Sequence, residues 1–315
     1  MKEQIYLDYN ATAPVRPEVA DAALDLLKQP SNASSVHGFG RRARMRVEKA
    51  RDQIAALAGC KNSQVIFNSG ATEGNNTVLQ SFTGQRIFVS AIEHPAVLDA
   101  AQDAEKIPVR SDGVVDVDAL MALMDRQPAP ALVSVMFVNN ETGVIQPVEE
   151  ISKRVHEAGA QLHVDAVQAA GRIPVNMNRL GIDFLTLSAH KIAGPQGVGA
   201  LIVGPCAKAP VLLRGGGQEK RARAGTENVA GIAGFGIAAE LALSDAEHYQ
   251  KLTELRDAME NRLKEIAPEA VIFGANALRV ANTSLIALPG IPSKTQLMHM
   301  DLEGIAVSNG SACSS

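Results

Sequence analysis

Six runs of apolar, β-branched residues alternate with segments of helical periodicity, and this alternation constrains the fold more than any other feature. The runs are nearly unbroken, as in strands that helices cover on both faces of a sheet. Between them, residues 41–59 and 148–160 have helical spacing and end in or beside glycine. The pattern predicts an α/β fold with a mainly parallel sheet. The six predicted strands lie within residues 63–70, 86–94, 130–141, 160–168, 183–191 and 198–204.

The pattern changes near Asp245. A long charged helix is predicted over residues 247–267, and short apolar segments follow at 269–274, 280–288 and 304–310. One helix followed by several short strands indicates a second, smaller α+β unit.

Composition and charge narrow the class of protein. The chain has 315 residues, 46% of them hydrophobic, and a formal net charge of −4, so it can bury a sizeable core. A negative charge and only 3% aromatic residues argue against a nucleic-acid or anionic-membrane surface. The first residues lack the apolar region of a signal peptide, and no run reaches a membrane-spanning length. We therefore expect a cytoplasmic protein that binds neither nucleic acid nor membrane.

The cysteines predict neither a disulfide framework nor a resident metal site. Cys60, Cys206 and Cys313 are widely spaced, and none belongs to a CxxC pair. Cys313 stands apart from the other two because it lies among small residues in "SNGSACSS".

Polar residues recur where the predicted strands end. In open α/β sheets ligands bind outside the carboxyl ends of the strands, so many polar ends in succession favour one composite site. Any one of them alone is explained as well by capping or turning of the chain. The polar ends are Asn68-Ser69-Gly70, Glu93-His94, Asn139-Asn140-Glu141, Asp165 with Gln168, and Ser188 with His190-Lys191.

Lys191 is the most informative of these residues. It follows a buried strand and precedes a Gly/Pro loop, which favours an amine held at the sheet edge over an ordinary surface lysine. A lysine in that position can form a Schiff base with a carbonyl cofactor. Ser188 and His190 beside it supply hydrogen-bond donors suited to a phosphate.

The segment "NSGATEGNN" (68–76) reads as a strand, a glycine turn and the start of a helix. Backbone N–H groups and the Thr72 hydroxyl can bind an anion there, although Gly-Ala-Thr turns are also common caps. The lysine of a P-loop is absent from the motif.

Two further residues point to a pyridine ring. A carboxylate at Asp165 opposite a pyridinium nitrogen would keep the ring protonated, although an aspartate capping a helix explains it equally well. His94 can stack on a ring and move protons, or serve as a structural histidine. Lysine, aspartate and a phosphate cup together fit pyridoxal 5'-phosphate (PLP).

Two segments suggest other functions on first inspection. The glycine-rich residues 214–228 lack the preceding strand and the βαβ spacing of a nucleotide-binding loop. The basic residues 40–52 are interpreted as a solvated helix face.

Taken together, stretches in family order from Tyr6 to Ser315 strongly resemble the cysteine desulfurases, PLP enzymes with an aspartate aminotransferase-like fold. Such an order is far more specific than any single motif. The stretches are "YLDYNATAPVRPEV", "SSVHGFGRRAR", "SGATEGNN", "EHPAV", "VNNETGVIQPV", "HVDAVQAAGRIPVN", "SAHKIAGPQGVGAL", "GGGQE" with "AGTENV", and "GSACSS".

The resemblance implies a role for each candidate residue. Lys191 would form the Schiff base, Asp165 would pair with the pyridine nitrogen, and His94 would stack on the ring and assist acid–base steps. Gln168 and Asn140 would contact the ring-oxygen side. The phosphate would be held by Ala71, Thr72, Ser188 and His190, joined by Thr226 from the second subunit of a homodimer.

The resemblance also implies the reaction. Sulfur would leave L-cysteine as L-alanine forms, and Cys313 would carry it as a persulfide to a sulfur-acceptor or scaffold protein for iron–sulfur cluster or thio-cofactor synthesis. Cys313 would meet metal only through transient iron–sulfur contact. Gly310 and the small residues after it would let the thiol move. Residues 16–250 would form the large PLP-binding domain, and residues 1–15 with 251–315 the small domain.

Two of the departures of this sequence from the family pattern concern the small domain and the dimer contact. Relatives continue beyond the cysteine loop, so we expect an incomplete small domain and can assign no residue to the substrate carboxylate. Arg221 and Ala224 stand where glycine and serine are common, near the expected dimer contact. Two alternatives remain open: another PLP enzyme such as a selenocysteine lyase, and a truncated desulfurase-like protein with weak or no activity.

Overall fold

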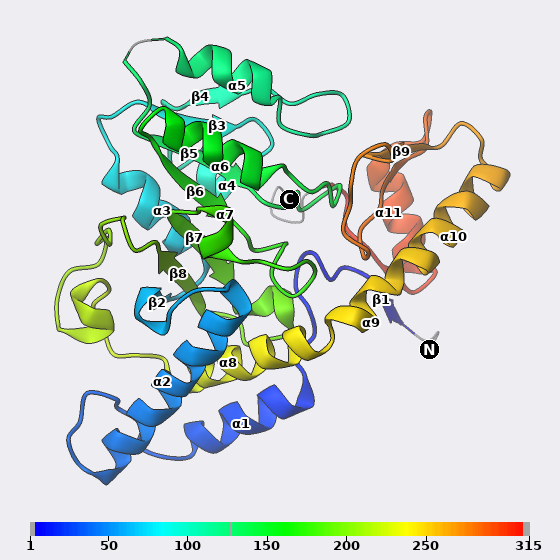
Figure 1. Ribbon diagram of the computed structural model, residues 1–315. Coiled ribbons are helices and arrows are strands. Elements are labelled where there is room, and N and C mark those ends of the chain that lie inside the picture. The colour runs from blue at the N-terminus through cyan, green and yellow to red at the C-terminus, as the bar shows by residue number, and fades with distance from the viewer. Residues whose placement is uncertain (1–3, 127, 311–315) are drawn as a thin grey trace.

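One seven-stranded sheet organises the molecule (Figure 1). The computed structural model describes residues 4–126 and 128–310. The strand order is β2-β8-β7-β6-β5-β3-β4, and β8 alone among these strands runs in the opposite direction to the other six. The expected α/β fold with a mainly parallel sheet is confirmed. The strands are β2 (Val65–Asn68), β3 (Ile87–Ser90), β4 (Glu105–Ile107), β5 (Leu132–Met136), β6 (Gln161–Asp165), β7 (Phe184–Ser188) and β8 (Gly199–Val203).

Helices cover both faces of this sheet, as the unbroken apolar strands predict. On one face α3 packs against β2, β6, β7 and β8, and on the other α6 packs against β6 while α8 packs against α1 and α2. The helices of this part are α1 (Pro17–Leu27), α2 (Gly38–Ala58), α3 (Ala71–Ser81), α4 (Pro95–Leu98), α5 (Val117–Met124), α6 (Val148–Glu157), α7 (Met177–Leu180) and α8 (Val229–Ser244). Short 3₁₀ helices lie at η1 (Asn62–Gln64), η2 (Ala189–Ile192) and η3 (Gln218–Arg221).

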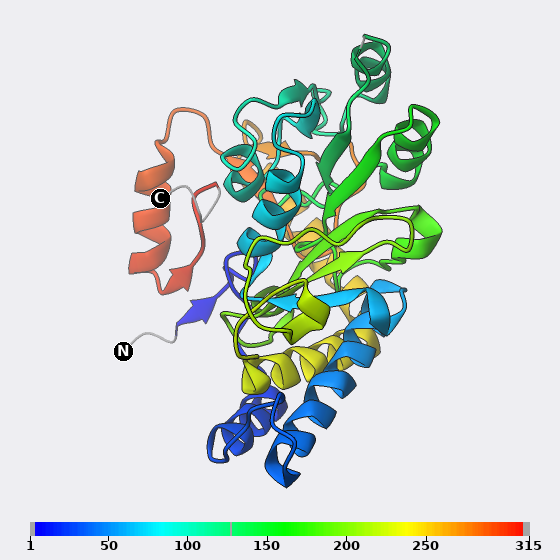
Figure 2. The same cartoon turned by 90° about the vertical axis from the view of Figure 1, so that its left-hand side faces the viewer.

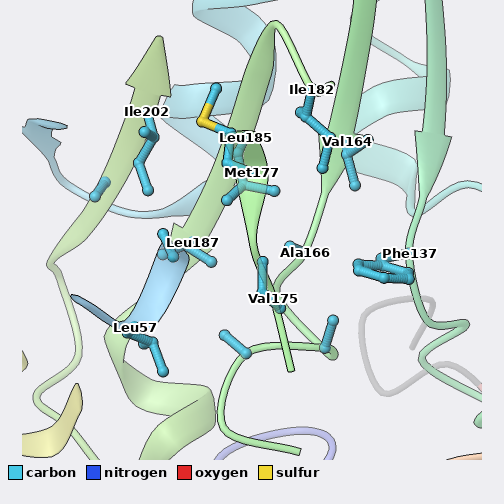
Figure 3. Close-up of a cluster of buried hydrophobic side chains, with 14 of the residues drawn as sticks. Leu57, Phe137, Val164, Ala166, Val175, Met177, Ile182, Leu185, Leu187 and Ile202 are labelled. Carbon is cyan, nitrogen blue, oxygen red and sulfur yellow. The ribbon is translucent and has the colours of Figure 1, made fainter. Parts of the chain in front are cut away.

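The two faces of the sheet lie against two separate cores, because successive residues of a strand point to opposite faces. In β8, Ala200 and Ile202 belong to the larger cluster and Leu201 and Val203 to the smaller one. Figure 3 shows part of the larger cluster, with Ile202, Leu185 and Val164 side by side in adjacent strands. The opposite face, toward α3, carries buried polar side chains as well as apolar ones. The candidate site lies at the end of that polar face, where Asp165 and Ser188 end their strands.

All six predicted strands of the sheet are present, whereas β4 was missed. It has three residues, two of which are the charged Glu105 and Lys106, and it lies at the sheet edge beside β3. An apolar pattern therefore could not reveal it.

The C-terminal part has its own small sheets, as predicted. Strands β9 (Val271–Phe273) and β10 (Leu285–Ala287) pair antiparallel, and β11 (Ile305–Ala306) follows α11 (Ser293–Leu302). Strand β1 (Ile5–Tyr6) pairs parallel with β11, so the N-terminal strand lies beside the C-terminal unit (Figure 2).

The prediction of one continuous helix over residues 247–267 is wrong, because the segment forms two helices. It is divided at Lys251 into α9 (Ala246–Gln250) and α10 (Leu252–Ile266). The Lys251 N–H donates to the carbonyl of His248, a tighter bond than the α-helical one, while the Gln250 side chain donates to the Arg172 carbonyl. The division therefore falls where the helix contacts the large sheet domain.

The basic residues 40–52 lie mostly in α2, where most of the charged side chains are exposed as predicted. Arg51 is the correction, because it is buried. Both of its terminal nitrogens donate to Glu219 at 2.8 Å. Among the described residues, no single helix is long and apolar enough to cross a membrane, although the bent pair α8 and Ala246–Ile266 reaches that length and composition when its arms are combined.

Candidate functional site

A cavity of about 360 Å³ lies at the strand ends that carry the predicted polar residues. It gathers side chains from segments far apart in the sequence, as expected for a sheet whose parallel strands end at one edge. Nine of the ten predicted cofactor-binding residues line it. They are Ala71, Thr72, His94, Asn140, Asp165, Gln168, Ser188, His190 and Lys191.

Lys191 lies in η2, directly after β7. Its Nζ donates to the main-chain carbonyl of Ala11 at 2.7 Å and also to that of Asn10. The amine is therefore held inside the cavity rather than on a solvated face, as the strand-end position predicted. An amine held against two carbonyls at a cavity wall is positioned to meet a carbonyl ligand.

The N-terminus of α3 forms one end of the cavity. Gly70 is its N-cap and has φ 150°, a conformation that favours glycine, and within residues 4–126 and 128–310 no side chain caps the helix. A Cβ at Gly199 would lie 2.7 Å from the Gly70 Cα, so glycine there lets β8 approach the turn. Open N–H groups at a helix start suit an anionic group such as a phosphate.

Asp165 ends β6 on the face toward α3. Its Oδ2 accepts a hydrogen bond from Asn75 Nδ2 at 2.7 Å, and its Oδ1 accepts one from the Val167 N–H at 3.0 Å. Both Asp165 and Asn75 are buried. Two hydrogen bonds hold the carboxylate in one orientation at the cavity wall, where it can face a ring nitrogen.

His94 caps α4, and its Nδ1 accepts from the Ala96 N–H at 3.0 Å. Burial lowers the pKa of His94, the charge of Asp165 opposes that shift, and Lys191 adds to it. The ring is therefore neutral near pH 7, and its Nε2 carries the proton because Nδ1 is an acceptor. Burial and Lys191 also lower the pKa of His190 to about 4.

The polar groups of the cavity fit PLP. Its phosphate matches the start of α3, its ring nitrogen matches Asp165, and its carbonyl matches Lys191. The buried Oε1 of Gln168 has no hydrogen-bond partner among the described residues, and a hydroxyl on a ring in the cavity would supply one.

Sequence reasoning missed Asn10 and Asn75, which also line the cavity. Asn75 follows Ala71 by one helical turn, so its position on the inner side of α3 could have been found from helical spacing. Asn10 has no such local signal, because the hydrogen-bond partners of its side chain are distant in the sequence.

Thr226 does not line the cavity in its own chain and is exposed. Its predicted contact with the site of a second subunit stays a prediction. Cys313 lies outside the described residues, and so does its predicted iron–sulfur contact. Burial raises the pKa of Cys60 to about 11, so its thiol stays protonated. Cys206 is exposed and lines a different cavity.

The 218–221 segment beyond the cavity is strained. Glu219, Lys220 and Arg221 have φ of 43°, 57° and 69°, a region that favours glycine. The buried Glu219 carboxylate holds this conformation through Arg51 and through the Phe67 N–H at 2.8 Å. Arg221 therefore occupies a left-handed position at the point where the family resemblance led us to note a missing glycine.

Comparisons with known proteins agree with this geometry. The family model "Aminotransferase class-V" matches residues 5–315. The chain is 42% identical over 330 residues to the cysteine desulfurase IscS of Dictyoglomus turgidum, covering 100% of this chain and 83% of that protein. It is 43% identical to a cysteine desulfurase of Nostoc sp., covering 99% of this chain and 81% of that one. A solved NifS-like protein from Rickettsia africae superposes with a TM-score of 0.94 and 40% identity, covering 98% of this chain and 88% of that one.

Proposed function

Because this chain belongs to the cysteine desulfurase family of the class-V aminotransferases, we propose that it removes sulfur from L-cysteine, forms L-alanine and carries the sulfur as a persulfide on Cys313. The family depends on PLP. The observation that carries the proposal is the meeting of the Lys191 amine, the Asp165 carboxylate and the start of α3 in one cavity.

Residues that line the cavity would hold PLP. Its phosphate would lie at the start of α3, its ring nitrogen against Asp165, and its ring oxygen toward Gln168 and Asn140. When bound, PLP supplies an electron sink for the pair left on the substrate carbon.

Proton transfer falls to two side chains of this chain. Lys191 Nζ would take the proton from the substrate carbon and return one. His94 is neutral near pH 7 and carries its proton on Nε2. It would stack on the ring and donate this Nε2 proton when a step requires an acid.

The sulfur step balances as a simple exchange. The Cys313 thiolate attacks the substrate sulfur, an S–S bond forms as the C–S bond breaks, and the carbon keeps the electron pair and gains a proton. L-cysteine and a thiol thereby become L-alanine and a persulfide. Ser308 and Gly310 line the same cavity as Lys191, and Gly310 precedes Cys313 by only three positions in the sequence, which supports this role for Cys313.

Partners and domains extend the proposal. We infer a homodimer in which Thr226 reaches the partner's phosphate site, and a sulfur-acceptor or scaffold protein of iron–sulfur or thio-cofactor synthesis, in the cytoplasm. We also infer that residues 16–250 form the PLP-binding domain and that residues 1–15 act with 251–315. The pairing of β1 with β11 supports that division.

The test measures both products. Protein loaded with PLP is incubated with L-cysteine and a reducing thiol, and alanine and sulfide are quantified. Equal amounts of both are expected. Lys191→Ala should lower the rate by about 10²–10⁴-fold, and Cys313→Ser should abolish both products, whereas Cys206→Ser should match the wild type. Alanine formed at the wild-type rate by Cys313→Ser would indicate another kind of PLP enzyme, and wild-type protein that fails to bind PLP would exclude the proposal.

A further inference from the structure

Arg172 is a buried arginine whose neighbour differs from those of the other buried arginines. Arg51 and Arg279 each hold a carboxylate, Glu219 and Glu260, through two hydrogen bonds of 2.7–2.8 Å. Arg172 is only 5% exposed, yet its NH1 donates to a neutral amide oxygen, Oδ1 of Asn10, at 2.8 Å. Burying a cation is costly unless it is paired with an opposite charge or fully hydrogen-bonded. A buried guanidinium that binds a neutral amide therefore indicates a role other than pairing with a carboxylate.

The Asn10 side chain joins three parts of the molecule. Its Nδ2 donates to the Asn140 carbonyl and to Thr283 Oγ1, both at 3.1 Å. Its Oδ1 accepts from Asn282 Nδ2 at 3.3 Å in addition to Arg172. With both ends of the amide engaged, the side chain is restricted to one orientation, and the 8–12 segment is fixed to the C-terminal unit and to the turn after β5.

The main chain of the same residue faces the cavity. The Asn10 carbonyl accepts from Gln168 Nε2 at 3.0 Å and from Lys191 Nζ, and the neighbouring Ala11 carbonyl also accepts from Lys191. Arg172 itself does not line the cavity. The hydrogen bond to Asn10 connects the Arg172 guanidinium to the cavity.

We propose that Arg172 is a positioning residue for Lys191: through the Asn10 amide it fixes the two carbonyls that hold the lysine amine and thus aims that amine at the cofactor. A hydrogen bond from a charged donor is stronger than one between neutral groups, which explains a guanidinium here. A segment without regular structure would otherwise be mobile, and small misplacements of a reacting group reduce rates strongly. The inference rests on the proposed function, since it presumes that Lys191 meets PLP.

The experiment uses the full chain freed of cofactor and has three measurements. They are the dissociation constant for PLP by visible titration, the visible circular dichroism of bound PLP, and the labelling rate of Lys191 by an amine reagent, read by peptide mass spectrometry without PLP. Arg172→Met should weaken PLP binding about tenfold, change the dichroism and speed the labelling of Lys191. Arg172→Lys, which keeps the charge, should restore most of each signal.

Two further variants separate positioning from general damage. Arg179→Met removes an exposed arginine whose partner is Glu149 and should behave as wild type. Asn10→Ala should show at least the Arg172→Met defects, because it also removes the contacts with Asn140, Thr283 and Asn282. Adding Arg172→Met to Asn10→Ala should change little further, because the acceptor of the guanidinium is already gone.

Unchanged binding, dichroism and labelling in Arg172→Met would overturn the proposal, as would losses that simply add in the double variant. If Arg172→Met does not fold, Asn10→Ala decides: normal Lys191 labelling there would equally overturn it. Failure of the wild type to bind PLP would instead refute the proposed function, while the labelling measurement would still report on Arg172.

Discussion

Asp165 Oδ2 and Asn75 Nδ2 lie 2.7 Å apart, with both side chains buried between β6 and the inner side of α3. The helix that presents its N-terminus to the cavity therefore also fixes the carboxylate that would face the ring nitrogen.

Loss of that contact should weaken cofactor binding. Asn75→Ala removes a hydrogen bond to a buried charged group, which is worth about 1.5–3 kcal/mol, so affinity for PLP should fall at least about tenfold. Visible titration of cofactor-free protein measures it. Asn76→Ala is the matched control, because the Asn76 side chain donates to the Thr72 carbonyl on the same helix and not to Asp165. Equal affinities for the two variants would contradict the role given to Asn75.

Glu93 should make stability depend on pH. Burial, reinforced by the charge of Asp165, raises the pKa of Glu93 well above its usual range. Above the ordinary carboxyl pKa the unfolded chain has released this proton while the folded protein keeps it, so stability falls as pH rises, by up to about 1.4 kcal/mol per unit.

Glu93→Gln imitates the protonated acid and should flatten that slope. The free energy of unfolding of the cofactor-free wild type and of the variant is measured by urea unfolding at several pH values from 5 to 8. The two slopes against pH are then compared. Burial lowers the pKa of His163 to about 3, which gives a slope of opposite sign below about pH 6.5, but this is common to both proteins and cancels. Parallel curves would mean that Glu93 is ionised in the folded protein.

The Arg51–Glu219 ion pair should contribute more to stability than the position of Arg51 in a basic helix suggests. Arg51→Met leaves the Glu219 carboxylate buried without its cation and should cost about 3–5 kcal/mol of unfolding free energy. Arg44→Met removes an arginine of the same helix whose side chain is 59% exposed and should change stability by less than about 0.5 kcal/mol. Similar losses in the two variants, measured by urea unfolding, would show that Glu219 does not depend on Arg51.

Arg221→Gly should stabilise the protein. A residue with a Cβ in the left-handed conformation destabilises the folded protein by roughly 1–2 kcal/mol, which glycine would relieve. The greater conformational freedom of glycine in the unfolded chain offsets about 0.5–1 kcal/mol of this gain. A net gain of about 0.5–1 kcal/mol is expected in thermal or urea unfolding. The same substitution at Arg179, inside α7, should instead cost about 1 kcal/mol. A loss at both positions would argue against strain at Arg221.

The sheet and much of the cavity could be predicted from sequence because their signals are local. Buried strands show as unbroken apolar runs, and their polar ends meet wherever the strands are parallel, which is why Asp165, Ser188 and Lys191 were found together. β4 is short and charged at the sheet edge, so it left no such pattern.

Asn10, Arg172 and Glu219 could not be predicted, for a different physical reason. Each is defined by a partner more than a hundred residues away, as Asn10 is by Arg172 and Glu219 by Arg51. Nothing in the flanking residues separates a buried, paired charge from a solvated one, and Arg51 was accordingly assigned to the solvated face.

The central claim is that Cys313 takes the sulfur. After PLP-loaded protein is incubated with L-cysteine and without a reducing thiol, the peptide containing Cys313 is analysed by mass spectrometry beside those containing Cys60 and Cys206. The account predicts the added mass of one sulfur atom on the Cys313 peptide, none on the other two, and none on any peptide in Lys191→Ala. Alanine formed from L-cysteine with no added sulfur on Cys313 would contradict it.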